Sequence, residues 1–188
     1  MPGVKNLYYT SYFPFLSILL FSAAFAVSLE KKLVALLQEI GIYHALSEFF
    51  SAGNIELLLF GSFVLCFVML LSALKVLADM MLQFSCLFFA DDKQEEHDQR
   101  MKEGRFLFLA GGVLSLLFSQ LFWLLSVIFL LTGLSYFVFI TYRMSNHFTT
   151  SGLVGFVFFQ MLFWLSFMLG FGFLLLRTYR YVLESLPV

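Results

Sequence analysis

Charged residues are scarce in this sequence. Asp, Glu, Lys and Arg make up only 12% of its 188 residues, and the formal net charge is −1. A soluble domain carries about 25% charged residues, so this chain has too few to coat a water-facing surface. The near-zero net charge provides no basic field for a nucleic acid. An ordinary soluble domain and a nucleic-acid partner are therefore both excluded.

Residue patterns that carry chemistry are also missing. The two cysteines, Cys66 and Cys86, lie in apolar stretches, where reduced, buried thiols are the expected state. The sequence contains no nucleophile elbow, HExxH, Walker loop, CxxC or dinucleotide-binding glycine pattern. We therefore predict no enzymatic activity, no cofactor and no metal site.

Apolar residues are abundant instead. They form 61% of the chain, which includes 27 phenylalanines. A bilayer core of ~30 Å needs about 20 apolar residues per helix. Four runs satisfy this requirement, at approximately 8–29, 55–77, 106–132 and 153–176. The sequence predicts a single all-α membrane domain over residues 1–188, built as a four-transmembrane-helix bundle.

The third apolar run is too long for one crossing. It extends from Phe106 to Tyr142, which is ~55 Å of helix at 1.5 Å per residue and exceeds what ordinary tilt absorbs. We expect a helix break at Thr132–Gly133, because glycine adopts backbone conformations that other residues avoid.

Two segments outside the spans have distinct characters. Residues 30–52 combine apolar positions at helical spacing with Glu39, His44 and Glu48, and this pattern predicts amphipathic interfacial helices hinged near Gly41. Residues 91–105 contain ten charged residues. They predict a short, solvated helix in a cytoplasmic loop, ending at the glycine of position 104.

Orientation follows from Lys and Arg. With four crossings, the N-terminus, the 91–105 loop and the C-terminus share one side of the membrane. That side holds Lys5, Lys93, Arg100, Lys102, Arg105, Arg177 and Arg180, whereas the other holds Lys31, Lys32 and Arg143. The positive-inside rule then places both termini in the cytoplasm. A rival interpretation treats residues 1–26 as a cleaved secretory signal that ends at Ala24–Phe25–Ala26.

A polar stripe interrupts the second apolar run. Lys75, Asp79 and Gln83 recur at four-residue spacing, which places them on one helix face. If the span is 55–77, both charges lie at the inner headgroups and only pair or snorkel. If the membrane covers about 69–89, the pair lies inside it and marks a functional site. The depth of Lys75 and Asp79 in the membrane decides between these two interpretations.

Two glutamines lie in otherwise apolar runs. Gln120 and Gln160 are each followed by Phe-Trp-Leu-type sequence, and in an antiparallel pair of spans they reach a similar depth. We expect an interhelical hydrogen bond between them; the alternative is a polar substrate site. Gly111–Gly112 and Gly170/Gly172 are expected to be close-packing points between helices.

The opening "YYTSYFPFLSILLFS" (residues 8–22), together with the four-span layout and the length, resembles the YufK-like family of small bacterial membrane proteins. The resemblance implies a multi-pass protein of the bacterial cytoplasmic (inner) membrane, from a family with no established activity. It brings no catalytic residues with it.

Three function classes remain. The first is a non-enzymatic accessory or structural subunit that acts through membrane lipids and either a membrane-protein partner or further copies of itself, because excess apolar surface needs a neighbour to cover it. The alternative is a small oligomeric transporter or channel that uses Lys75 and Asp79. An intramembrane enzyme acting on lipid has the least support, since it needs convergent acid–base groups.

Overall fold

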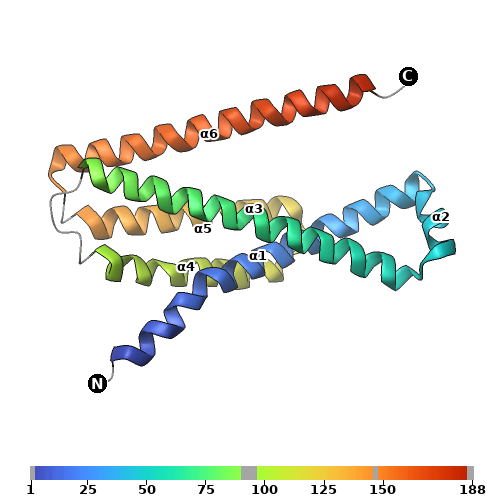
Figure 1. Cartoon of the computed structure of the whole chain (residues 1–188), viewed down its shortest axis with the longest axis horizontal. Coiled ribbons are helices and arrows are strands. Elements are labelled where there is room, and N and C mark those ends of the chain that lie inside the picture. Colours follow the sequence, from blue (N-terminus) through green and yellow to red (C-terminus); the bar gives the residue numbers. More distant parts are fainter. Residues whose placement is uncertain (1–2, 90–96, 146–147, 186–188) are drawn as a thin grey trace. The chain divides into compact units, whose positions relative to one another are not determined.

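The computed structural model describes residues 3–89, 97–145 and 148–185, and these residues form helices and turns without a β-strand. In chain order the helices are α1 (Gly3–Glu39), α2 (Ile42–Phe49), α3 (Ala52–Phe89), α4 (His97–Leu117), α5 (Phe122–Met144) and α6 (Thr150–Ser185) (Figure 1). The predicted all-α fold is confirmed.

The chain divides into two compact units. One comprises Met1–Ala78 with Lys93–Arg143, and the other comprises Asp79–Asp92 with Met144–Val188. Helix α3 is continuous through the division. The first unit therefore contains α1, α2, most of α3, α4 and α5, while the second contains the end of α3 and α6.

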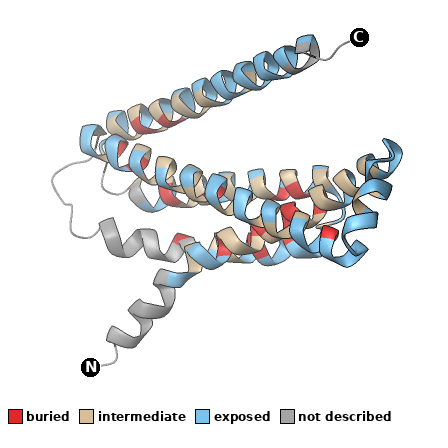
Figure 2. Cartoon of the chain, turned by 45° about the vertical axis from the view of Figure 1, so that its right-hand side comes forward, coloured by how far each residue is buried: buried red, intermediate tan, exposed pale blue. Residues whose placement is uncertain are grey.

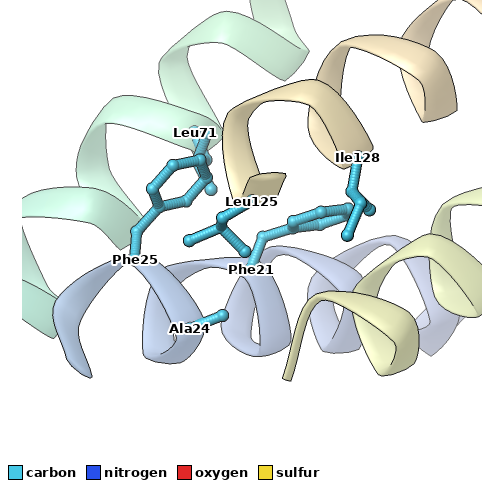
Figure 3. Packing of buried hydrophobic residues seen from close by; sticks show 6 residues of the cluster. All are labelled: Phe21, Ala24, Phe25, Leu71, Leu125 and Ile128. Atoms are coloured by element: carbon cyan, nitrogen blue, oxygen red, sulfur yellow. The ribbon is translucent and has the colours of Figure 1, made fainter. Parts of the chain in front are cut away.

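The core of the first unit is built on α1. Its buried residues are Phe21, Ala24 and Phe25 from α1, Leu71 from α3, and Leu125 and Ile128 from α5 (Figure 3). The Phe25 ring stacks on Phe67 of α3 with ring centroids 5.3 Å apart. Figure 2 shows that such buried positions are a minority and that most of the described helix surface is exposed, as expected for helices whose solvent is lipid.

Helices α4 and α5 form an antiparallel hairpin. A Cβ added at Gly104 would lie 2.8 Å from a ring carbon of Tyr136, and one added at Gly111 would overlap Thr132. The rings of Phe108 and Tyr136 are 4.9 Å apart. Residues later in α4 contact residues earlier in α5, so the two helices run in opposite directions, as Figure 1 shows.

The predicted break at Thr132–Gly133 is wrong. The helix is interrupted at residues 118–121 instead, where the Leu121 amide donates to the Phe118 carbonyl at 3.1 Å. Thr132 stays helical and donates its hydroxyl to the Ile128 carbonyl at 2.7 Å. The polar Ser119–Gln120 pair lies in the turn, whereas Thr132 is accommodated within the apolar helix by its back-bond.

The predicted packing role of Gly111–Gly112 is confirmed. Gly111 lies against Thr132, and a Cβ added at Gly112 would lie 3.2 Å from the Leu20 side chain of α1. The prediction that the solvated helix ends at Gly104 is wrong, because α4 continues through it to Leu117. The part of the predicted loop at residues 90–96 lies outside the described residues.

The amphipathic segment 30–52 is only partly as predicted. Its first half continues α1 without a break to Glu39, because Glu, Lys and Leu are good helix formers. The hinge at Gly41 is confirmed: its φ is 82°, a left-handed conformation that glycine adopts at no steric cost. Phe21 and Phe25, which precede the proposed cleavage position after Ala26, are core residues of this unit; the cleaved-signal alternative stays a prediction.

In the second unit, the end of α3 packs on the start of α6. A Cβ added at Gly152 would lie 2.9 Å from the Phe89 carbonyl oxygen, and one added at Gly155 would lie 2.5 Å from the Phe89 ring. The Phe89 and Phe159 rings are 6.4 Å apart. Phe156 is fully buried here.

Four helices of the described residues are long and apolar enough to cross a membrane: Tyr12–Glu39, Ala52–Phe89, Phe122–Arg143 and Thr150–Tyr181. A shorter apolar helix covers Phe106–Leu117. The predicted span 106–132 thus joins parts of two helices, α4 and α5. Where the membrane begins and ends along each helix stays a prediction.

The α4–α5 contact gives a matched pair of variants. We expect Gly111→Ala to lower the free energy of unfolding by about 1–3 kcal/mol, the usual cost of overpacking, because its methyl group meets Thr132. Gly133→Ala meets nothing within 4 Å and should be neutral or stabilising by up to ~1 kcal/mol. Thermal unfolding in detergent measures both, and equal effects would contradict the hairpin packing.

Candidate functional site

Gln120 lies in the turn between α4 and α5. Its Oε1 accepts a hydrogen bond from the Lys31 Nζ of α1 at 2.5 Å. The next lysine, Lys32, places its Nζ 4.5 Å from the centroid of the Phe122 ring at the start of α5. Two consecutive lysines of α1 therefore hold the tip of the α4–α5 hairpin.

Sequence reasoning missed this contact. It treated Gln120 as an interhelical link in mid-membrane, whereas the structure places the residue in a turn beside the charged end of the apolar part of α1. The available signal was a Lys-Lys pair directly after one apolar run and a Ser-Gln pair inside another.

Gln160 lies on α6 in the second unit and is 3% exposed. Its Oε1 has no hydrogen-bond partner among the described residues. Gln120 belongs to the first unit and already accepts from Lys31. The hydrogen bond between the two glutamines stays a prediction.

The polar stripe lies on α3. Lys75 and Asp79 are half-buried, and Gln83 is exposed. The spacing of the three residues within one uninterrupted helix puts them on one face. The division between the two units falls at Ala78–Asp79, between the two charged residues.

A surface depression near the first unit's α2 end was not predicted. It has a volume of about 270 Å³ and is lined by Glu30, Gly53, Glu56, Leu57 and Phe60. Two carboxylates alone do not form a metal centre, and the described part of the chain holds no group of three or more metal-ligating side chains. An apolar cavity of about 220 Å³ also lies between α4 and α5, lined by Leu107, Leu114, Ile128, Leu131, Thr132 and Ser135.

Several half-buried and buried hydroxyl groups are bonded to their own helices. Ser85 donates to the Met81 carbonyl at 2.8 Å, and Ser115 donates to the Gly112 carbonyl at 2.6 Å. Such back-bonding satisfies a hydroxyl where no water is present. The hydroxyls of these two serines are thus satisfied within their own helices.

The Lys31–Gln120 contact is testable by a double-mutant cycle. Lys31→Met, Gln120→Leu and the double variant should show a coupling free energy of about 1 kcal/mol, since a hydrogen bond to a charged group is strengthened while exposure weakens it. The matched control is the Lys32→Met/Gln120→Leu cycle, where we expect no coupling. Unfolding in detergent measures both cycles, and zero coupling in the first would show that the contact does not form.

Comparison with known proteins places these features in a family. The family model described as "Family of unknown function (DUF5366)" matches residues 30–187. Over 186 residues the chain is 37% identical to the "Uncharacterized membrane protein YufK" of Bacillus subtilis (strain 168), covering 98% of this chain and 100% of that protein. No solved structure matches the chain. With four helices apolar enough to cross a bilayer and a family match over most of its length, the chain is a membrane protein that belongs to the DUF5366 family of unknown function.

Proposed function

We propose that this protein is a non-enzymatic accessory or structural subunit that binds another polypeptide, or a second copy of itself, within the bilayer. The observation that carries the proposal is the surface around Gly170 on α6. A Cβ added at Gly170 or Gly172 would meet no described atom within 4 Å. The sequence predicted that both glycines pack against another helix, and within the second unit they do not.

Gly61 and Gly133 also meet no described atom within 4 Å, so an open glycine alone does not indicate a partner, and Gly170 differs from them in the residues around it. Glycine costs about 1 kcal/mol relative to alanine in a helix, and in lipid its benefit is the close approach of a second backbone. Ser166 precedes Gly170 by one turn, which gives the small-xxx-small spacing of helix–helix contacts. This pattern supports a partner helix on that face.

Aromatic rings border the same face. Phe163, Phe167 and Phe171 recur every four residues, with ring centroids 6.2 and 6.3 Å apart in successive stacked pairs. Such a row is rigid and loses little side-chain entropy when a partner packs on it. Leu165 and Leu169, which border Ser166 and Gly170 on the side away from the aromatic row, are exposed, so apolar side chains flank the two small residues.

The test is native mass spectrometry of the protein purified from its host membranes in a mild detergent. We expect a second polypeptide or a homo-oligomer at fixed stoichiometry. Gly170→Ile should reduce the bound fraction at least tenfold, a loss of about 1.4 kcal/mol, whereas Leu169→Ile on the same helix should not. A monomer without any bound polypeptide would contradict the proposal.

For location, we propose the bacterial cytoplasmic membrane, with the N-terminus and residues 91–105 on the cytoplasmic side. The four basic residues of that loop, Lys93, Arg100, Lys102 and Arg105, support this orientation. The sequence-based expectation that the C-terminus shares that side holds only if the chain crosses the membrane four times.

A small transporter or channel is the second candidate function, and one observation favours it. Lys75 and Asp79 are half-buried charged residues within the long apolar helix α3. The Phe25–Phe67 stack sets Gly61 near the level of Lys31, so Lys75 lies ~21 Å along α3 from that level. In a core of ~30 Å this supports placing Lys75 inside the inner leaflet, where a charge indicates a polar pathway.

This candidate predicts loss of flux in one variant. Asp79→Asn should abolish proton or K⁺ flux in proteoliposomes loaded with the appropriate dye, because it removes the charge that would face the pathway. Glu48→Gln, an exposed change on α2, is the matched control and should leave flux unchanged. Equal flux in Asp79→Asn and in the unaltered protein would exclude a role for the pair in transport.

A further inference from the structure

We propose that the chain crosses the membrane five times, with α4 as a short fifth span, so that its two termini lie on opposite sides. This inference concerns the path of the chain and does not depend on the proposed function. It rests on two sets of contacts, one within each unit.

In the first unit, α1 and α4 run in the same direction. The Phe13 ring lies 6.4 Å from Phe106, Leu20 lies against Gly112, and Lys31 bonds Gln120. From the first contact to the third, the residue numbers increase along both segments, so the two segments run in parallel. Helix α4 therefore enters the bilayer where the apolar part of α1 begins and reaches the level where it ends.

The apolar part of α4 is shorter than a typical membrane-spanning helix. Phe106–Leu117 contains 12 residues, or ~18 Å of helix at 1.5 Å per residue. From Phe13 to Lys31, α1 rises ~27 Å by the same measure. The turn at 118–121 and the long Lys31 side chain close the remainder, because snorkelling side chains accommodate a short span.

Because α5 returns antiparallel to α4, it brings the chain back to the side from which α4 started. The contacts of Gly104 with Tyr136 and Phe139, and of Gly111 with Thr132, fix this direction. Helices α4 and α5 therefore make one crossing each, in opposite directions. As a result, α6 begins on the side where α3 ended.

The second unit supports the same path independently. Phe89, the last residue of α3, packs on Gly152, Gly155 and Phe159 at the start of α6. With four crossings, α3 would end on the inner side and α6 would begin on the outer side, separated by a core of ~30 Å. Their contact requires that both ends lie on one side.

The charge distribution remains compatible with a cytoplasmic N-terminus. With five crossings, that side holds Lys5, Lys93, Arg100, Lys102, Arg105 and Arg143, and the other side holds Lys31, Lys32, Arg177 and Arg180. The excess of basic residues on the N-terminal side is smaller than with four crossings but has the same sign.

The test is labelling of single cysteines in intact cells with a membrane-impermeant maleimide. Cys66 and Cys86 are first replaced by alanine, and Ser51→Cys, Ser119→Cys, Ser145→Cys and Ser185→Cys are then introduced one at a time. We expect positions 51, 119 and 185 to be labelled alike. Position 145 should be labelled only after the cells are permeabilised.

The alternatives give different patterns. With four crossings, positions 51 and 145 share one side, position 185 lies on the other, and position 119 is shielded in the bilayer; that result would overturn the proposal. An inverted protein labels only position 145 in intact cells, which preserves five crossings and reverses the orientation. Labelling of every variant after permeabilisation shows that each introduced cysteine is present and reactive.

Discussion

The structure depends on the close packing of α1 against three other helices. In lipid, apolar side chains gain nothing by leaving the solvent for one another, so helix association rests on close contact and on hydrogen bonds. Phe21, Ala24 and Phe25 provide that contact, with Leu71 on one neighbour and Leu125 and Ile128 on another. Gly112 lets α4 approach the same helix near Leu20. One helix thus positions all the others of its unit.

Polar contacts fix how far the α4–α5 hairpin extends along α1. The Lys31–Gln120 hydrogen bond and the Lys32–Phe122 contact hold the hairpin tip at the charged end of α1. The hydroxyls of Ser85, Ser115 and Thr132 donate to carbonyls of their own helices, which leaves packing at these positions to the apolar side chains. Charged residues make up only 12% of the chain, and the Lys75–Asp79 pair within the apolar helix α3 keeps a transport function in view.

Much of the fold was predictable, because long apolar runs, a hinge glycine at position 41 and the glycines at 111 and 112 each have a local physical meaning. The hairpin was not predictable from length and hydropathy. Residues 106–142 form one uninterrupted apolar run, and only the tertiary contacts of Gly104, Gly111 and Gln120 reveal where it turns. The same error carried into the candidate site: Gln120 was assigned a depth from an unbroken span, so its lysine partner was missed. Gln160, predicted to bond Gln120, is buried on α6, and its Oε1 has no partner among the described residues.

The central claim is that α3 ends beside the start of α6, on one side of the membrane. Cross-linking in native membranes tests it most directly, with Phe89→Cys and Gly155→Cys in a background lacking Cys66 and Cys86, treated with a short bifunctional maleimide. The account predicts an intramolecular cross-link, because a Cβ added at Gly155 would lie within contact distance of the Phe89 side chain. Reaction of each cysteine alone, without a cross-link in the double variant, would contradict it and restore a four-crossing path.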